Sequence, residues 1–366
     1  MNFTLSREAL LNPLQLVAGV VERRQTLPIL SNILFRLEGN KLSLTGTDLE
    51  VEIIGFTEVE SGGESAQVTV SARKILDICR SLPEGATLDF ASADGKAVLT
   101  SGRSKFSLAT LPANEFPSVD QGEQSVEFVV SASLIKGLIE STSFAMAQQD
   151  VRYYLNGMLW EVTTNQLRAV ATDGHRLALC DSNCEISVDG KVSAILPRKG
   201  IAELSRLLAE DEVRVSIGSN HIRVTGADYC FTSKLVDGAY PDYDRVVPKG
   251  GDKQVVGNRE LLKQAFSRTA ILSNEKYRGV KIQLQQDVML MVANNPEQEE
   301  AQEEVAISYG GEVLEVGFNV SYLLDVLNVL KGKEIRFTLS DSNSSALIEE
   351  ASGDSQGIYV VMPMRL

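Results

Sequence analysis

The fold is indicated by a short segment that the chain repeats, Leu42-Ser-Leu-Thr-Gly-Thr-Asp48 and Leu167-Arg-Ala-Val-Ala-Thr-Asp173. A weaker third copy reads Leu290-Met-Val-Ala-Asn-Asn295. Apolar and polar residues alternate in each copy up to a polar corner, as in a half-buried strand that ends in a turn. Because the chain has 366 residues, copies at this spacing divide it into thirds of about 122 residues and predict an internal repeat.

Three other features recur in the same order. Each third begins with a short strand that leads into a helix through a residue type that caps helix N-termini, namely Ser6, Ser131 and Asn258. A second helix with apolar residues at helical spacing is expected within 76–82, 202–208 and 324–330. A terminal hairpin comes last, at 106–111, 231–236 and 358–366. Chance similarity explains poorly why these features keep their order three times.

The repeats predict an α+β fold of three similar domains, with bounds at 1–122, 126–247 and 253–366. The segments between them are polar and contain Gly, as linkers usually do. Hydrophobic residues make up 43% of the chain, which is typical of a globular protein. No apolar run approaches the ~20 residues of a membrane span, and the N-terminus lacks the pattern of a signal peptide. We therefore expect a cytosolic protein.

The net charge of −14 argues against nucleic acid as a partner until its distribution is considered. The six predicted helical segments with their flanks, 7–24, 72–80, 132–143, 198–206, 259–268 and 320–333, together carry +8, which leaves −22 for the rest. A basic helix taken singly is more often only a solvated face. An excess shared across the helices instead predicts one surface that meets phosphates while the remaining surface stays negative.

The chain has no base-reading motif such as a helix-turn-helix or a zinc finger. Basic residues without such a motif favour contacts with phosphates that are independent of DNA sequence. Contacts of this kind weaken at cellular salt, so they would not retain a protein on DNA for long. A closed ring would solve this problem by topology, because release then requires an interface to open.

The standard catalytic motifs for phosphate loops, nucleophile elbows and zinc hydrolases are absent from the sequence. The nearest candidate for acid–base chemistry is the pair Asp173 and His175, but a turn after a strand is the commoner meaning of such a pair. The four cysteines form no C-x-x-C pair and have no zinc spacing. The acidic run 296–304 is more often a solvated face than a metal site, or it pairs with a basic edge across a subunit boundary. We expect no cofactor and no metal.

The C-terminus is apolar up to its last residue, Tyr359-Val-Val-Met-Pro-Met-Arg-Leu366, although chain ends are usually polar and frayed. Two readings stay open: the segment completes a sheet, or it completes a sheet and also lines a binding pocket. Flexible Met side chains suit a surface that accepts several ligands.

Longer segments resemble one family along the whole chain. They include Thr26-Leu-Pro-Ile-Leu30, Leu44-Thr-Gly-Thr-Asp-Leu-Glu50, Asp150-Val-Arg-Tyr-Tyr-Leu-Asn-Gly-Met158, Ala171-Thr-Asp-Gly-His-Arg-Leu177, Ala270-Ile-Leu-Ser-Asn-Glu-Lys276, Asn294-Asn-Pro-Glu-Gln-Glu-Glu300 and Val360-Val-Met-Pro-Met-Arg-Leu366. With them the chain resembles the bacterial DNA polymerase III β subunits, which are sliding clamps and processivity factors without catalytic activity.

The resemblance implies a head-to-tail homodimer that forms a ring of six domains, with helices on the inner face and antiparallel sheets outside. Its partners would be double-stranded DNA and primed template, the polymerase III α subunit, other polymerases and repair proteins with clamp-binding motifs, and an ATP-dependent clamp loader. The location would be the cytoplasm, in association with the nucleoid. Two alternatives are a peptide-binding scaffold that never encloses DNA and a hydrolase that uses Asp173 and His175.

The resemblance also implies roles for single residues. The expected DNA contacts are Arg24, Arg73, Gln149, Tyr153 and Tyr154, although strand packing is an alternative for the two tyrosines. The expected pocket for partner peptides is lined by Leu155, Thr172, Gly174, His175, Arg176, Leu177, Pro241, Arg245, Val246, Tyr277, Asn319, Tyr322, Ser345, Val360, Met362, Pro363, Met364 and Arg365. The expected dimer interface contains Lys74, Phe106, Leu108, Ile271 and Leu272.

Two positions differ from some relatives, and a charge match is expected at the ring closure. Gln148 stands where some relatives have His, and Asp244 replaces a basic residue, so DNA handling and peptide preference at these points are open. Residues Glu297 to Glu304 would face Arg103 and Lys105 of the neighbouring subunit.

Overall fold

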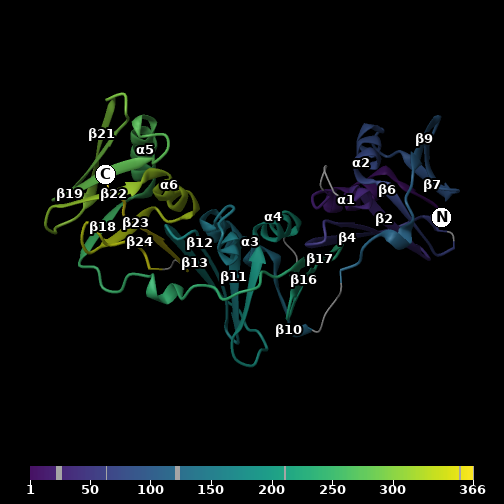
Figure 1. Cartoon of the computed structure of the whole chain (residues 1–366), viewed down its shortest axis with the longest axis horizontal. Coiled ribbons are helices and arrows are strands. Elements are labelled where there is room, and N and C mark those ends of the chain that lie inside the picture. The colour runs from purple at the N-terminus through teal and green to yellow at the C-terminus, as the bar shows by residue number, and fades with distance from the viewer. Residues whose placement is uncertain (22–26, 63, 120–123, 210–211, 354–355, 366) are drawn as a thin grey trace. The chain divides into compact units, whose positions relative to one another are not determined.

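The computed structural model describes residues 1–21, 27–62, 64–119, 124–209, 212–353 and 356–365 (Figure 1). Helices and antiparallel strands alternate along these residues in the order that the repeats predicted, so the α+β prediction is confirmed. None of the helices in the described ranges is both long enough and apolar enough to cross a membrane.

The first third of the chain begins and ends with strands; 3-10 helices are labelled η. Its elements are β1 (Asn2–Ser6), α1 (Arg7–Ala18), η1 (Pro28–Ser31), β2 (Asn32–Glu38), β3 (Lys41–Thr47), β4 (Val51–Glu58), β5 (Ser61–Gly62), β6 (Ala66–Ser71), α2 (Ala72–Ser81), β7 (Thr87–Ala93), β8 (Lys96–Ser101), β9 (Ser104–Ala109) and η2 (Ala113–Glu115).

The middle third repeats the order of strands and helices. Its elements are β10 (Gln124–Ser131), α3 (Ala132–Thr142), η3 (Ser143–Ala145), η4 (Tyr153–Asn156), β11 (Gly157–Thr163), β12 (Gln166–Thr172), β13 (Arg176–Asn183), β14 (Val192–Pro197), α4 (Arg198–Leu207), β15 (Glu212–Gly218), β16 (His221–Thr225), β17 (Tyr229–Lys234) and η5 (Tyr243–Arg245).

The last third follows the same plan up to the C-terminus. Its elements are β18 (Lys253–Asn258), α5 (Arg259–Thr269), η6 (Ala270–Leu272), β19 (Gly279–Gln285), β20 (Val288–Asn294), β21 (Glu300–Ser308), β22 (Leu314–Asn319), α6 (Val320–Val329), β23 (Glu334–Leu339), β24 (Ala346–Glu350) and β25 (Gly357–Val361).

Local chemistry accounts for where the helices begin. The Ser6 side chain accepts a hydrogen bond from the Ala9 amide at 3.2 Å, and the Asn258 side chain accepts one from the Leu261 amide at 3.1 Å. Both bonds satisfy N–H groups that have no partner within the first turn of a helix. Two of the three predicted N-caps are therefore confirmed, and Ser131 stays a prediction.

The described residues pack as two compact units. Unit 1 consists of Met1–Ile135 with Lys199–Leu235, and unit 2 consists of Lys136–Arg198 with Val236–Leu366. Each unit contains a long sheet, and the middle third of the chain contributes strands to both. The predicted division into 1–122, 126–247 and 253–366 stays a prediction.

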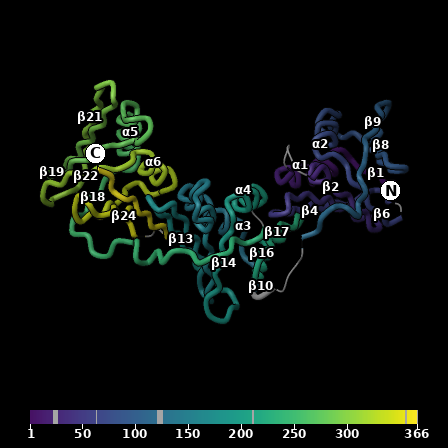
Figure 2. Tube along the Cα trace, viewed as in Figure 1, coloured from purple at the N-terminus to yellow at the C-terminus, as the bar shows by residue number. Residues whose placement is uncertain are grey.

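Unit 1 contains two sheets, with strand orders β5-β1-β7-β8-β9 and β10-β15-β16-β17-β4-β3-β2-β6. Strands from distant parts of the chain meet where β17 lies antiparallel to β4 and Phe231 pairs with Ile53 (Figure 2). Helices α1 and α2 pack together, and α1 also covers β4 (Figure 1). Phe3 and Phe35 stack on Phe90, with ring centroids at 4.7 and 5.5 Å, and stabilise the core between the layers.

Unit 2 contains one sheet, in the order β14-β11-β12-β13-β25-β24-β23-β18-β21-β20-β19-β22. Here the strands from the middle and last thirds meet where β13 lies antiparallel to β25, and Ala178 pairs with Tyr359. Helices α5 and α6 pack together, and α5 also covers β21. The C-terminal segment thus completes a sheet, which confirms the part that its two readings shared.

Candidate functional site

A tight turn between β12 and β13 forms one rim of the candidate site. The Thr172 hydroxyl donates to the Arg176 carbonyl at 2.7 Å and accepts from the Gly174 amide at 3.1 Å. The Asp173 carboxylate accepts from the amides of His175 and Arg176 at 2.9 and 3.0 Å. Gly174 has a φ of 87°, a conformation that favours glycine. The turn is therefore rigid and leaves the His175 side chain exposed.

Arg176 joins this turn to the helix of the last third. Its guanidinium pairs with Asp173 and with Asp325 of α6, and it donates to the Phe144 carbonyl at 2.7 Å. It also lies over the Tyr322 ring, with the guanidinium carbon 4.4 Å from the centroid. Only 11% of the Arg176 side chain is exposed. Its partners fix the guanidinium, so Arg176 serves as a framework for the site.

A cluster of buried apolar side chains lies next to the turn. Its members come from five strands and from the segment between β17 and β18, and they are Leu159, Val170, Leu177, Leu179, Ile195, Tyr243 and Val360. Half-buried residues border it, namely Tyr154, Val236, Tyr240, Val246, Val247, Leu347 and Ile358. We call this set the apolar cluster. A buried apolar floor with partly exposed walls is the usual setting of a hot spot for a partner's apolar side chains.

The chain end is attached beside the apolar cluster. Beyond β25, the Met362 amide donates to the His175 carbonyl at 2.9 Å, and the Met364 amide donates to the Gly317 carbonyl at 2.8 Å. The Met362 residue remains 40% exposed. The ordered backbone therefore holds flexible apolar side chains at the surface, where they could contact a ligand.

The comparisons with known proteins agree along the whole chain. Three domains of the DNA polymerase III beta subunit match it: the N-terminal domain at residues 1–120, the central domain at 129–242 and the C-terminal domain at 244–365. The Beta sliding clamp of Pseudomonas aeruginosa is 59% identical, with 100% of both chains covered. The chain belongs to the DNA polymerase III beta subunit family.

Two solved structures support the same assignment. The crystal structure of the DNA polymerase III subunit beta from P. aeruginosa aligns with a TM-score of 0.98 at 59% identity and covers 100% of both chains. A DnaN sliding clamp from the same organism bound to griselimycin aligns with a TM-score of 0.97 at 59% identity, again over 100% of both chains. This sliding clamp is thus a processivity factor and not an enzyme.

The alternative of a hydrolase built on Asp173 and His175 is wrong for this sliding clamp. One Asp173 carboxylate oxygen accepts two backbone amides, and the other pairs with Arg176 at 3.2 Å. The carboxylate maintains the turn and has no role as a base. The described residues also contain no group of His, Cys, Asp or Glu side chains that could hold a metal ion.

Some of the predicted pocket residues belong to the apolar cluster or pack against it, and the others do not. Leu177 and Val360 form its floor and Val246 part of its wall, while Leu155 is buried close by in η4. The remaining predicted residues have these settings: Pro241 is half-buried, Arg245 pairs with Asp242, Tyr277 is 56% exposed, Asn319 caps α6, Ser345 precedes β24, and Pro363 and Arg365 belong to the chain end. The pocket assignment itself stays a prediction.

Several residues of the apolar cluster were missed from the sequence, including Tyr240, Tyr243 and Val247. The Tyr240 hydroxyl accepts from the Thr172 amide at 3.1 Å and so ties this segment to the rim. A signal for it was present, because Tyr240-Pro241 repeats Phe116-Pro117 of the first third. Tyr243 gave no such signal, since its partners lie on other strands.

The predicted DNA contacts of the sliding clamp differ in their settings. Arg24 lies outside the described residues. The Arg73 side chain on α2 is 76% exposed and pairs loosely with Asp77 at 3.6 Å. Gln149 is exposed with a φ of 58°, and Tyr153 is 75% exposed. These described side chains are free to meet a ligand, but their role stays a prediction.

The alternative of strand packing for the two tyrosines is wrong for Tyr153, which is 75% exposed, and both residues lie in η4 and not in a strand. Tyr154 packs against the apolar cluster while Tyr153 points away from the core. The two neighbours therefore have different surroundings, and Tyr154 is placed to contact a ligand of the cluster.

The predicted dimer contacts lie at two places. On unit 1, Lys74 is exposed on α2, and β9 carries the half-buried Phe106 and the buried Leu108. On unit 2, Ile271 in η6 is 75% exposed and Leu272 is half-buried. An aliphatic side chain as exposed as Ile271 favours contact with another protein surface.

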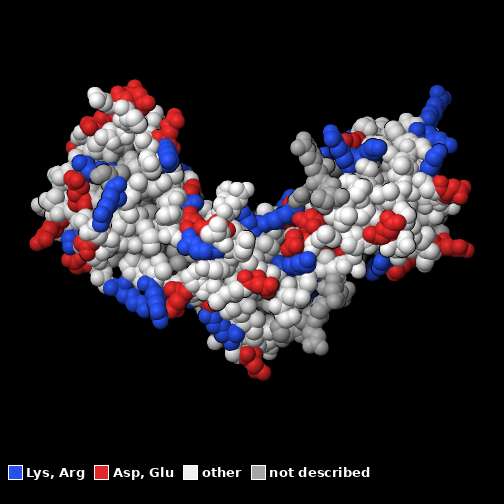
Figure 3. Space-filling model, viewed as in Figure 1, with Lys and Arg blue, Asp and Glu red and all other residues white. Residues whose placement is uncertain are grey.

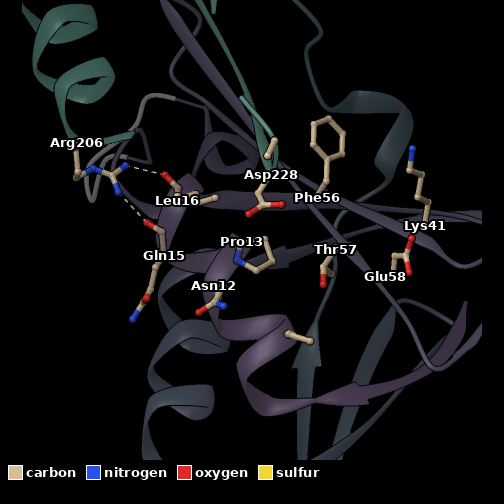
Figure 4. Close-up of a pocket in the computed structure, with 12 residues that line it drawn as sticks. Asn12, Pro13, Gln15, Leu16, Lys41, Phe56, Thr57, Glu58, Arg206 and Asp228 are labelled. Atoms are coloured by element: carbon tan, nitrogen blue, oxygen red, sulfur yellow. Dashed lines mark hydrogen bonds between the residues drawn. The ribbon is translucent and has the colours of Figure 1, made fainter. Parts of the chain in front are cut away.

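A polar hollow of about 770 Å³ in unit 1 contains none of the predicted site residues (Figure 4). Arg206 of α4 reaches α1 at its edge and donates to the carbonyls of Gln15 and Leu16 at 3.0 and 2.6 Å. Glu203 orients the guanidinium at 2.8 Å. Since α1 has no basic residue in its own last turn, Arg206 supplies the positive charge that a helix C-terminus favours.

We expect Arg206→Met to lower the free energy of unfolding by about 1 kcal/mol, because two carbonyls of α1 lose a charged donor. Urea denaturation would measure this change. Arg214→Met is a matched control, since Arg214 pairs with Glu127 on the exposed surface and such pairs contribute little. Equal effects of the two substitutions would contradict the capping role.

Proposed function

We propose that two copies of this sliding clamp close head to tail into a ring around duplex DNA. Each copy would have three domains, 1–122, 126–247 and 253–366, and would tether the polymerase III α subunit, other polymerases and repair proteins at the apolar cluster. A clamp loader would open the ring with ATP. The ring would work in the cytoplasm at the nucleoid and would need no cofactor.

The observation that carries the ring proposal is the repeated junction between thirds of the chain. The fourth strand of the first repeat, β4, pairs with β17, the last strand of the second. In the same way, β13 pairs with β25. The equivalent strands that remain are β21 and β9. In the described sheets β9 borders β8 alone, and β21 meets β18 only at its end, through Ile307 and Ser308. Two open edges of this kind favour pairing between subunits.

The polar corner of each repeat gives the register of that pairing. At each corner a side-chain oxygen accepts a hydrogen bond from a backbone amide at the start of the next strand or directly before it. Asp48 accepts from Val51, Asp173 accepts from Arg176, and Asn295 accepts from Glu299. Glu299 is therefore equivalent to Val51, and Ala301 is equivalent to Ile53. Because Ile53 pairs with Phe231 and Phe106 is the equivalent of Phe231, we expect Phe106 to pair with Ala301 of the other subunit.

This register matches opposite charges. Arg103 would lie opposite Glu304, and Lys105 would lie diagonal to Glu300 and Glu304. All four side chains belong to exposed residues. Figure 3 shows basic side chains at the β8–β9 end of unit 1 and acidic ones at the β20–β21 end of unit 2. The match supports head-to-tail pairing of β9 with β21 in a closed ring. Pairing of two like ends, β9 with β9 or β21 with β21, would bring like charges together and is unfavourable.

The tethering role rests on the apolar cluster and the chain end. Its floor would accept Leu and Phe side chains of a short partner peptide. Arg245 directly precedes the wall residue Val246, and the exposed His175 lies in the turn beside the cluster. The relative from P. aeruginosa that is bound to griselimycin supports a ligand site on this fold. Arg73, Gln149, Tyr153 and Tyr154, together with Arg24, would contact DNA through phosphates or stacking.

The decisive experiment compares closed and open DNA. The protein is loaded with a clamp loader and ATP onto a nicked circle, and half of the sample is then cut once. At ~1 M salt, where exposed charges are largely screened, a ring should stay on the circle and leave the cut DNA. Cut DNA with a bulky protein bound at each end is the control and should retain the ring. Equal loss from circle and cut DNA would favour the peptide-binding scaffold instead.

A further inference from the structure

A network of polar side chains adjoins the apolar cluster of unit 2 through Tyr243. The Tyr243 hydroxyl donates to the Glu161 carboxylate and accepts from Arg168 at 3.1 Å. Arg168 makes two further bonds to Asp181, at 2.6 and 2.8 Å, and Lys191 pairs with Glu161. Tyr243 and Glu161 are only 5% and 7% exposed. The network therefore joins three strands, β11, β12 and β13, to one tyrosine.

Tyr243 belongs to a connecting segment, residues 236–247, that we call the strap. The Val236 amide donates to the Ile195 carbonyl at 2.8 Å at one end of the strap. At the other end the amides of Val246 and Val247 both donate to the Tyr243 carbonyl, at 2.9 and 3.1 Å. These two valines are walls of the apolar cluster. The position of the Tyr243 backbone therefore fixes the position of Val246 and Val247.

The Tyr243 hydroxyl is suited to act as a permanent anchor. Burial, followed by the hydrogen bond to Glu161, raises the pKa of this hydroxyl to about 12. It therefore keeps its proton at neutral pH and can donate to the carboxylate. A buried carboxylate that loses such a donor is costly, since its desolvation is no longer offset.

Unit 1 provides an internal comparison, because its strands have the same registers. Glu161 pairs with Arg168 and Arg168 pairs with Asp181 across β11, β12 and β13. The equivalent positions across β2, β3 and β4 are Arg36, Ser43 and Phe56. The repeated aromatic–Pro pair places Val119 at the position of Tyr243. None of these four residues can reproduce the network.

The two units also differ at the position that forms the floor of the apolar cluster in unit 2. Leu177 pairs with Thr172 and with Val360 in unit 2, whereas its equivalent in unit 1 is the buried Glu52, which pairs with Thr47 and Thr232. The fold therefore forms this junction without the polar network. The network occurs in the unit whose junction has an apolar floor, which associates it with ligand binding and not with a general requirement of the fold.

We propose that Tyr243, anchored by Glu161 and Arg168, is a positioning residue that holds the Val246–Val247 wall in place for a partner peptide. The role rests on the proposed peptide pocket. With the wall held in advance, the peptide need not order the strap when it binds, and such preorganisation increases affinity. The positioning role belongs to the Tyr243 hydroxyl, which is bound to Glu161 and Arg168.

The test uses Tyr243→Phe in the full dimer and a fluorescein-labelled short peptide with Leu and Phe anchors. We expect about a tenfold loss of affinity, equivalent to about 1.4 kcal/mol. We also expect faster hydrogen exchange at the Val246 and Val247 amides, with protection restored at saturating peptide. Glu161→Gln is the second variant, because its amide can still meet the tyrosine hydroxyl, and it should retain most of the affinity.

Tyr229→Phe is the matched control. Tyr229 is 7% exposed in unit 1, and its hydroxyl has no hydrogen-bond partner among the described atoms. This variant should bind the peptide like the native chain. If the native chain fails to bind the peptide, the proposed pocket is wrong. If it binds but Tyr243→Phe has unchanged affinity and exchange, the pocket stands and the positioning role is overturned. A lower melting temperature alone would likewise leave Tyr243 a purely structural residue.

Discussion

A chain that carries both Ile271→Ala and Leu272→Ala is expected to lose its partner subunit, so that its mass in solution falls by half. Ile271 is 75% exposed in the single chain and Leu272 is half-buried, so both aliphatic side chains are available to pack across the seam. Truncation of a buried Leu or Ile to Ala costs about 2–5 kcal/mol. Because the proposed ring would have two identical seams, each substitution would act twice.

Light scattering at micromolar protein would measure the change. The double variant Leu261→Ala with Val313→Ala is the matched control, since these side chains are 53% and 67% exposed and lie outside the expected interface. The control should remain a dimer. An unchanged mass for the Ile271 and Leu272 variant would show that the seam lies elsewhere. It would also contradict the proposed pairing of Phe106 with Ala301 of the other subunit.

Deletion of Met364–Leu366 is expected to weaken the binding of partner peptides at least tenfold, a change of about 1.4 kcal/mol, while the dimer persists. The deleted residues follow β25, which ends at Val361, so the strand keeps its pairing with β13 and β24. The loss removes a flexible apolar side chain whose backbone is held at Gly317. Such side chains adapt to several ligands.

Fluorescence anisotropy with a labelled peptide would measure the affinity, and light scattering would check the dimer. Met364→Ala should show a smaller loss in the same direction, since it keeps the backbone bond to Gly317. Val313→Ala truncates an exposed side chain elsewhere in unit 2 and should bind normally. Full affinity after the deletion would separate the chain end from the pocket and limit it to completing the sheet.

The two predictions test separate surfaces. The seam variant changes η6, and the deletion changes the chain after β25. Distant substitutions without shared partners usually have additive effects. A monomeric seam variant should therefore still bind the peptide, and a peptide-deficient deletion should still form a ring. Loss of both properties in one variant would instead indicate that the chain no longer folds.

Features set by neighbouring residues were predictable from the sequence. Ser6 and Asn258 cap their helices as expected, because a side-chain cap involves residues only three apart. The corner at Asp173 forms the predicted turn for the same reason. The resemblance added Leu177 and Val360, which the structure places together in the apolar cluster.

Other features of the site could not be predicted. Tyr154 follows the exposed Tyr153 directly, yet it packs on the apolar cluster. Glu161 interrupts the apolar run of β11 and reads as a solvated position, although Tyr243 and Lys191 hold it in the interior. Its partners are separated from it by whole strands, so spacing along the chain contains no trace of them.

The sequence by itself determined the repeat, the α+β class, the caps and corners, and the family, since each depends on residue types at short or regular spacing. Only the tertiary structure decided that β17 meets β4, that β13 meets β25, and that the strap packs against the apolar cluster in unit 2. The physical reason is that burial depends on what packs on a residue from elsewhere in the chain. The same strand position holds Leu177 in one junction and Glu52 in the other, and tertiary packing makes only the former part of a floor for ligands.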